Sequence, residues 1–225
     1  GIAVLILLVL SIPLTDLRLG QPDDGNQPTS TTQRRAYDIQ KEAFGAGSNG
    51  PLLISVSRPD GGKLDKSQAT AISDSLNERD GVQFAAPPEI SPNGQAAIIG
   101  LVPTTSPQDA RTSQLVKDLR DRYTPEAIAG QDLVVHVGGQ TAVIDDLSTK
   151  IESRLPVFIG IVIGLSVLLL IAVFRSIWVP LASAVFNLLV IGAAYGVIVA
   201  VFQKGFGAGI IGIGDDVPVI AFAPL

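Results

Sequence analysis

The apolar run from Pro156 to Phe202, which is interrupted by charge only at Arg175, constrains this chain more than any other feature. Residues 156–174 and 179–202 contain no charged side chain. A helix needs about 17–25 mainly apolar residues to cross the hydrocarbon core of a membrane, and both stretches are long enough. The alternative is a buried hairpin of a large soluble protein. A helix that is apolar all round must be fully covered, however, and this chain offers little to cover it. The sequence therefore predicts two transmembrane helices joined by a tight turn.

The charged residues are concentrated before this run. Between Pro156 and Gly214 only Arg175 and Lys204 are charged, whereas residues 16–154 carry nearly all the remaining charge of a chain whose net charge is −5. A mildly acidic surface argues against a nucleic-acid partner, because phosphates favour clustered Lys and Arg. The absence of Cys excludes disulfides, Cys-ligated zinc and thiol nucleophiles.

Both ends of the sequence suggest a piece of a longer protein. The chain begins with Gly1, contains no Met, and stops where an apolar segment is starting, so residues 219–225 are expected to begin a further transmembrane helix. Residues 1–14 are apolar and could be the core of a signal peptide. Since they lack a basic leading region and a small-x-small cleavage pattern, the end of a transmembrane helix over residues 1–15 is preferred.

The segment between the apolar ends has the pattern of a compact α+β domain. A Ser/Thr cluster precedes a helix that is expected to end at Phe44, and Asp65 is expected to cap a second helix. The predicted elements are a helix over 33–44, a strand over 51–57, a helix over 65–79, strands over 82–84 and 95–102, a helix over 106–122 that starts at Ser106-Pro107, and a strand over 133–137. From residue 51 the order is β-α-β-β-α-β, the split βαβ arrangement of ferredoxin-like domains.

The chain then returns to a helical pattern that leads into the first membrane span. Val143, Leu147, Ile151 and Leu155 recur every four residues up to Pro156. This spacing predicts one long helix, or two coaxial helices kinked at the proline. We expect this connection to be stiff and to transmit motion between the soluble domain and the membrane.

No catalytic or metal site can be defended from the sequence, so we predict that the chain is not an enzyme and holds no cofactor or metal. The lone His136 on a strand is expected to be a packing or surface residue. Asp145-Asp146 is expected to be a solvated edge or a salt-bridge partner of Lys150, and Asp215-Asp216 a loop pair. Residues 207–212 spell G-x-G-x-x-G, but they follow a membrane span and not a strand, so this dinucleotide motif is rejected.

The apolar helices carry the candidate site residues. Gly160 with Gly164, and Gly192 with Gly196, each form a G-x-x-x-G pattern that lets two helices approach closely. Ser183, Asn187 and Tyr195 are expected on one helix face. An Asn in a span is costly unless it faces protein or water, so Asn187 marks either a pathway or an interhelical hydrogen bond. The two spans contain no Asp, Glu, His or Lys that could relay protons.

The positive-inside rule gives an orientation. Arg175 in the tight turn is expected to lie in the cytoplasm, which places the soluble domain and the loop 203–218 on the extracytoplasmic face.

Several motifs in order resemble those of one known family. They are D-L-R-L-G-Q-P-D-D at 16–24, R-A-Y-D at 35–38, F-G-A-G-S-N-G-P-L-L at 44–53, V-G-G-Q-T-A at 137–142 and N-L-L-V-I-G-A-A-Y-G at 187–196. Together they resemble the MMPL transporters of the resistance–nodulation–division (RND) superfamily. The chain is most similar to the start of the second half of these proteins: the end of the seventh span, the second porter domain, and spans eight and nine.

The resemblance implies a proton-driven exporter of lipids or other hydrophobic molecules in a bacterial inner membrane. Its partners would be that substrate, the membrane and the rest of its own chain, with homo-oligomerisation left open. In this family an Asp-Tyr pair on the tenth span belongs to the proton relay; that span would begin near Val219, so no relay residue can be placed on this chain. The expected division is 1–15, end of a span; 16–155, extracytoplasmic porter domain with a ferredoxin-like core at 51–138; 156–174 and 179–202, spans; 203–218, loop; and 219–225, start of a span. The alternative function is a membrane-anchored binding or assembly module without active transport, which would have no ionisable residue in the span after Leu225.

Overall fold

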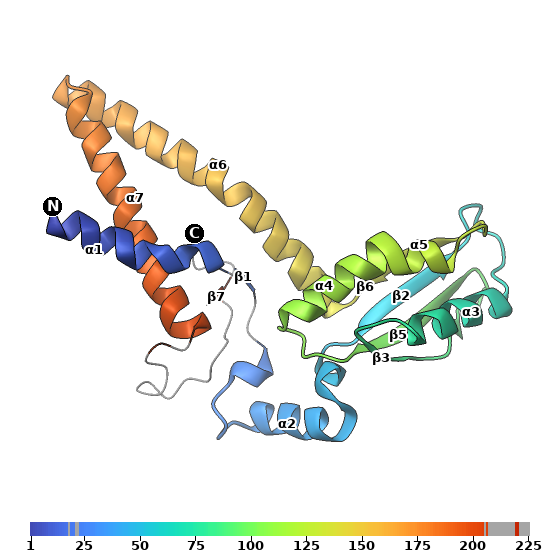
Figure 1. Ribbon diagram of the computed structural model, residues 1–225. Coiled ribbons are helices and arrows are strands. Elements are labelled where there is room, and N and C mark those ends of the chain that lie inside the picture. The colour runs from blue at the N-terminus through green and yellow to red at the C-terminus, as the bar shows by residue number, and fades with distance from the viewer. Residues whose placement is uncertain (18, 21–22, 205, 207–218, 221–225) are drawn as a thin grey trace. The chain divides into compact units, whose positions relative to one another are not determined.

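A computed structural model describes residues 1–225 except 18, 21–22, 205, 207–218 and 221–225. The chain divides into two compact units. One is an α+β unit of residues 23–146, and the other is an apolar helical unit of residues 1–22 and 147–225. Figure 1 shows the elements of both units.

A single antiparallel sheet forms the centre of the α+β unit. Its main strands are β2 (Leu52–Ser57), β3 (Val82–Ala85), β5 (Ala96–Pro103) and β6 (Val134–Gly138), which lie in the order β3-β5-β2-β6 with every neighbouring pair antiparallel. A short strand β4 (Glu89–Ile90) pairs with β5. In this order β5 lies between β3 and β2, and β2 lies between β5 and β6, so each β-α-β crossover passes over one intervening strand.

Two helical segments contribute to the core on one face of this sheet. They are α3 (Lys66–Asn77) and a segment made of α4 (Ala110–Asp118), a π-helical turn (Leu119–Tyr123) and α5 (Thr124–Ala127). The alternation expected of a half-buried strand is clear in β2, where Leu52 and Ile54 are fully buried while Leu53 between them is 47% exposed. The buried side chains of the strands join those of the helices in one hydrophobic core, to which α3 contributes Ile72 and α4 contributes Leu115 and Val116.

Most of the predicted elements of this unit are confirmed, and the first two helices have the caps that were expected. In α2 (Thr32–Phe44) the Thr31 hydroxyl accepts a hydrogen bond from the Arg34 amide at 3.3 Å, and Gly45 ends the helix with a φ of 95°. The Asp65 carboxylate caps α3 by accepting from the Ser67 amide at 2.9 Å. Short 3₁₀ turns at Asp24–Asn26 and Ala46–Asn49 flank α2 on either side.

Two predictions for this unit differ from the structure. The helix expected to begin at Ser106-Pro107 begins at Ala110, because residues 106–109 form a turn closed by the Asp109 amide and the Ser106 carbonyl at 3.0 Å. The Asp109 carboxylate then accepts from the Arg111 amide at 2.9 Å, which makes Asp109 the cap. Strand β4 was not predicted, since two residues are too few for a periodic pattern.

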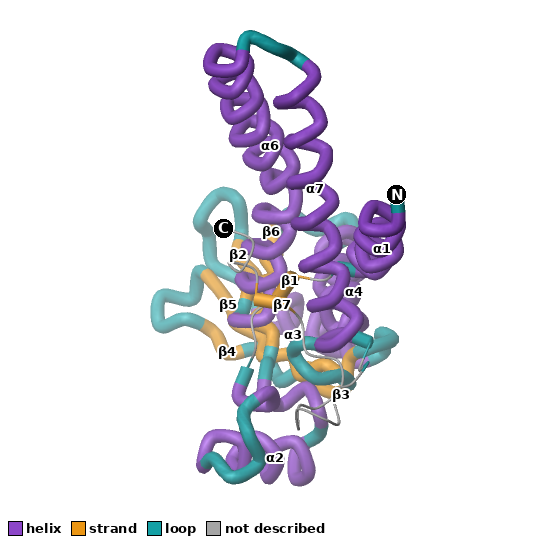
Figure 2. Tube along the Cα trace, turned by 90° about the vertical axis from the view of Figure 1, so that its left-hand side faces the viewer, coloured by secondary structure: helices purple, strands orange, loops and turns teal. Residues whose placement is uncertain are grey.

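In its described residues, the apolar unit contains three long or apolar helices. They are α1 (Ile2–Ser11), which continues as a 3₁₀ turn (Ile12–Asp16), α6 (Gln140–Phe174), whose first residues belong to the α+β unit, and α7 (Trp178–Ile198), which continues as a π-helical turn (Val199–Gln203). By length and composition, α6 and the segment Trp178–Val201 can each cross a membrane. Figure 2 shows the tight turn that joins α6 to α7. The long-helix alternative is confirmed, because α6 runs unbroken through Pro156.

The start of a further helix at residues 219–225 is not seen where the structure describes that segment. Val219 and Ile220 form a short strand, β7, that pairs in parallel with β1 (Leu19–Gly20). Val219 and Ile220 are both β-branched, and such residues favour extended backbone. Residues 221–225 lie outside the described part of the chain.

Candidate functional site

The glycine pair on α7 forms a close helix–helix contact. A Cβ atom at Gly196 would overlap the carbonyl oxygen of Leu10, and one at Gly192 would lie 3.0 Å from the Ser11 hydroxyl oxygen. Both glycines are buried. Ser11 donates to the Leu7 carbonyl at 2.7 Å and lies within 3.5 Å of the Leu189 carbonyl, so its hydroxyl is held at the crossing. The G-x-x-x-G pattern of α7 therefore lets α1 approach its backbone.

The glycine pair on α6 has different surroundings. No atom of the described residues lies within 4 Å of a Cβ built at Gly160 or at Gly164. Gly160 instead lines a cavity of about 550 Å³ together with Leu17, Pro156 and Leu188. The same sequence pattern thus packs against a helix on α7 and faces open space on α6.

A groove between α6 and α7 brings together the predicted polar residues of the spans. Ser183 and Asn187 from α7 and Ser166 from α6 line a cavity of about 360 Å³ whose other walls are mostly apolar. The Ser166 hydroxyl donates to the Val162 carbonyl at 2.8 Å. The Asn187 amide makes no hydrogen bond with the residues that the structure describes. Its donor and acceptor capacity is therefore available to a group that enters this groove.

Tyr195 is separated from these two residues. Ser183 and Asn187 are both exposed in the groove, whereas the half-buried Tyr195 does not line it. The common face that the sequence predicts for the three residues is thus seen for Ser183 and Asn187. The drift of a 3.6-residue helix over two turns accounts for the separation.

An ion pair lies at one end of the α1–α7 crossing. The Lys204 ammonium lies 2.6 Å from the Asp16 carboxylate, and both side chains are partly exposed. The sequence does not predict the pairing of Lys204 with Asp16. The two residues lie near opposite ends of the sequence, so no local pattern indicates that they pair.

The acidic pair Asp145-Asp146 proves to be part of a packing contact. Asp146 pairs with Arg120, whose second terminal nitrogen lies 2.9 Å from the carboxylate and also donates to the Val137 carbonyl at 3.0 Å. Of the two expected roles, Asp146 is an exposed salt-bridge residue, but its partner is Arg120 and not Lys150. Arg120 reaches it because the π-helical turn and the start of α6 both lie beside the end of β6, a proximity that the linear sequence does not reveal.

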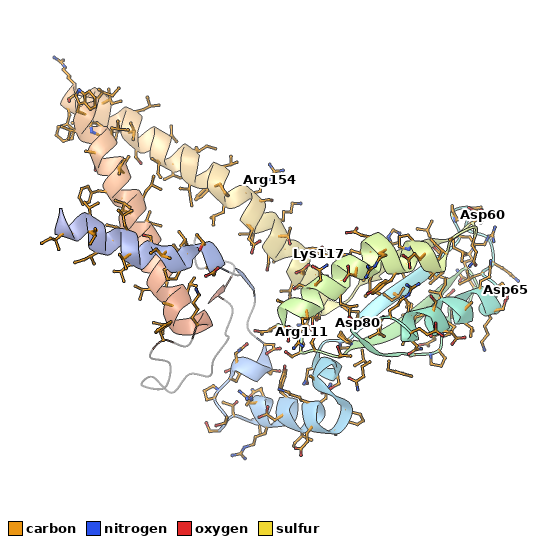
Figure 3. The ribbon with its side chains drawn as sticks, viewed as in Figure 1. Asp60, Asp65, Asp80, Arg111, Lys117 and Arg154 are labelled. Carbon is orange, nitrogen blue, oxygen red and sulfur yellow. The ribbon has the colours of Figure 1, made fainter. Side chains whose placement is uncertain are left out.

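The remaining polar candidates form no catalytic arrangement in the described residues. His136 is exposed on β6 opposite Ser55, as a surface histidine would be. The charged side chains labelled in Figure 3 on the α+β unit, such as Asp60, Asp65 and Arg111, lie on loops and at helix ends. The part of the chain that the structure describes contains no group of three or more His, Cys, Asp or Glu that could hold a metal ion. Asp215-Asp216 and residues 207–212 lie outside it.

Three of the sequence motifs converge in a cluster whose roles were not predicted. The Arg34 guanidinium pairs with Asp38 at 2.9 Å and donates to the Gly25 carbonyl at 2.6 Å, while the Asn49 amide donates to the Tyr37 carbonyl at 3.1 Å. Burial, followed by the nearby Asp23 carboxylate, raises the pKa of Tyr37 to about 12. These contacts hold the start of the α+β unit against α2.

Burial also raises the pKa of Asp23 in this cluster. The effect outweighs the hydrogen bond that its carboxylate accepts from the Gly25 amide at 2.8 Å, which acts in the opposite direction. The adjacent Asp24 adds to the increase in the pKa of Asp23. The second carboxylate oxygen of Asp23 is buried, which makes the charged form costly.

Comparison with known proteins gives one consistent family. The MMPL family matches residues 27–222. The chain is 37% identical to membrane protein YdfJ of Bacillus subtilis over 99% of its own length and 30% of that protein's length. It is 27% identical to the mycolic acid-containing lipids exporter MmpL11 of Mycolicibacterium smegmatis, over 91% of the chain and 22% of the relative. It is 21% identical to the trehalose monomycolate exporter MmpL3 of the same species, over 92% and 21%.

The chain therefore spans less than a third of the length of these relatives. Its match nevertheless extends from the α+β unit through both long apolar helices. The chain belongs to the MMPL family of membrane transport proteins.

Proposed function

We propose that this chain is part of a proton-motive-force-driven exporter of lipids or other hydrophobic molecules. The observation that carries the proposal is the MMPL match over residues 27–222, which includes the soluble unit and both apolar helices. Two relatives are named as exporters of mycolic acid-containing lipids and of trehalose monomycolate. Membership in a family of transporters favours a transport protein over an enzyme.

The α+β unit would supply the porter domain of this exporter. Its strand order β3-β5-β2-β6, with all neighbours antiparallel, is the order expected when two split β-α-β units interleave in a ferredoxin-like domain. We assign it to the second porter domain, on the extracytoplasmic side of a bacterial inner membrane. The unbroken helix α6 would transmit motion between this domain and the membrane.

The apolar unit would supply scaffold helices, with the α6–α7 groove facing the interior of the transmembrane bundle. An amide such as that of Asn187 is costly in lipid unless it meets protein or water. We therefore place Asn187 and Ser183 against a neighbouring helix or a water-filled path, with Gly160 and Gly164 available for helix packing. Gly192 and Gly196 would hold α1 against α7, and Tyr195 would lie near the edge of that contact.

A transport assay on the intact polypeptide tests this proposal. The purified protein is reconstituted into liposomes that contain a fluorescent lipid, and lipid transfer to an external acceptor is measured with and without an imposed proton gradient. We expect the gradient to raise the transfer rate and a protonophore to abolish the increase. Transfer that is absent, or equal with and without the gradient, would instead favour a membrane-anchored binding module.

A further inference from the structure

The turn between α6 and α7 contains a backbone conformation that its residue type does not favour. Arg175 has a φ of 50°, and within the described residues it is the one non-glycine residue with a positive φ. Glycine is the usual residue where a helix ends in this left-handed conformation, because a Cβ atom crowds the backbone there. Arg175 therefore places a charged side chain in a backbone conformation where glycine is the usual residue.

The charge of Arg175 is not paired within the part of the chain that the structure describes. Arg175 is exposed and has no carboxylate partner among the residues that the structure describes. It is also the one charged residue between Pro156 and Phe202. A guanidinium keeps its positive charge at physiological pH and favours planar, two-point contacts with phosphate.

The residues around Arg175 have the composition of a membrane interface. Phe174 and Ile177 are 56% and 60% exposed, and Trp178 is 76% exposed. Trp prefers the level of the lipid headgroups, and this turn ends two helices that are each long and apolar enough to cross the hydrocarbon core. An anionic headgroup at this level would meet Arg175 while Trp178 lay beside the upper acyl chain.

We propose that Arg175 binds the phosphate group of an anionic phospholipid at the tip of the α6–α7 hairpin, with Trp178 packed beside the same lipid. This inference goes beyond the proposed transport function. It requires only that the two helices span a membrane. A free phosphate ion has the same charged group, so the test must distinguish a lipid from an ion.

Trp178 is the single Trp of this chain and provides a local probe. The intact protein is reconstituted in phosphatidylcholine, with brominated phosphatidylglycerol or brominated phosphatidylcholine at equal mole fraction as the fluorescence quencher. The signal of Trp178 is the part that is lost in Trp178→Phe. We expect the anionic lipid to associate at Trp178 about fivefold more strongly than phosphatidylcholine. One cationic side chain near an anionic surface would produce a difference of this size.

Three variants separate charge from backbone conformation. Arg175→Asn and Arg175→Gly suit a positive φ but remove the charge, and both should bring the lipid preference close to one. Arg175→Lys keeps the charge and should retain most of the lipid preference. Because the first two variants relieve strain, their thermal unfolding midpoint in neutral detergent should equal or exceed that of the wild type, which excludes misfolding as the cause.

The proposal is overturned if wild-type Trp178 is quenched equally by both lipids, or if Arg175→Asn keeps the preference. Competition by inorganic phosphate gives a further arm. Loss of the anionic preference at millimolar phosphate in the wild type, matched to chloride at equal ionic strength, would assign the site to a free anion and contradict lipid binding.

Discussion

The α6 and α7 helices carry the same G-x-x-x-G pattern but use it differently. On α7 the two glycines are buried where α1 crosses, and a side chain at Gly196 would collide with backbone atoms. On α6 neither Gly160 nor Gly164 has an atom of the described residues near its absent side chain. A small-residue motif therefore permits close approach of a second helix. Whether a contact forms depends on which helix packs against it.

The largest effect should come from filling the α1–α7 crossing. Gly196→Leu places a side chain where the Leu10 carbonyl lies, so the two helices must separate. We expect destabilisation of about 3 kcal/mol or more, as severe overpacking produces. The yield of monodisperse protein and its thermal unfolding midpoint measure the loss.

Gly164→Leu is the matched control for this change. Its position is open among the residues that the structure describes, so its effect should stay within about 1 kcal/mol, the scale of the helix propensity difference. A loss as large as that of Gly196→Leu would show that another helix of the intact protein covers this face of α6, and the contrast between the two motifs would disappear.

The next effect tests the other side of α7, which faces the groove. Asn187→Leu removes the amide while keeping a similar volume, and we expect transport to fall about tenfold, the loss that corresponds to one hydrogen bond of about 1.4 kcal/mol. Protein level should change little. Lipid transfer in proteoliposomes, normalised to the amount of folded protein, measures this.

Ser183→Ala is a milder variant at the same groove and should retain more activity than Asn187→Leu. If Asn187→Leu lowers protein level and activity equally, the amide serves folding, and the groove side of α7 is used in the same structural way as the glycine side.

A smaller effect is expected on the pH dependence of stability, from two carboxylates with similar cap geometry. Asp23 and Asp65 each accept a backbone amide hydrogen bond, from Gly25 at 2.8 Å and from Ser67 at 2.9 Å. Burial raises the pKa of Asp23, whereas the hydrogen bond from Ser67 lowers the pKa of the exposed Asp65. The hydrogen bond lowers the pKa of both carboxylates, and the net shifts differ in sign because burial outweighs this bond only at Asp23.

The signs of the two pH dependences follow from these shifts. Unfolded Asp titrates near pH 4. The contribution of Asp23 is largest below that value and is lost as the pH rises through its higher folded pKa. The contribution of Asp65 is present above about pH 4 and is lost as the pH falls through its lower folded pKa.

Neutral variants measure these dependences. Asp23→Asn should raise the unfolding midpoint relative to the wild type as the pH increases, while Asp65→Asn should lower it at neutral pH and have less effect in acid. Parallel pH profiles for the two variants would contradict the assignment of opposite pKa shifts.

The smallest effect should come from the ion pair at one end of the α1–α7 crossing. Lys204 and Asp16 retain 43% and 58% side-chain exposure, so solvent screens their attraction. Lys204→Ala should change the free energy of unfolding by less than about 1 kcal/mol. Thermal unfolding at low and high salt checks this, and a loss comparable to that of Gly196→Leu would mean that charge, and not glycine packing, holds α1 to α7.

The amount of structure that could be predicted differs between local and distant features. The strand from Leu52 to Ser57 follows from a short apolar run, and the caps Thr31 and Asp65 follow from residue types beside a helical pattern. The turn at residues 106–109 was misjudged because Pro107 suits either a turn or a first helical position. In the candidate site, Asn187 was identified by its cost in lipid and Ser183 by its spacing on the same helix face. Arg120 as the partner of Asp146 carried no local signal.

The sequence alone predicts the two apolar helices, the order of strands and helices in the α+β unit, and the resemblance to the MMPL family. Each depends on residues close together in the chain or on motifs taken in order. The folded chain was needed to show which glycine pair contacts a helix, which cation pairs with Asp16 or Asp146, and how Asp23, Arg34 and Tyr37 converge. Such contacts join segments that are distant in the sequence, so they are selected by the packing of a whole unit and not by local backbone preference.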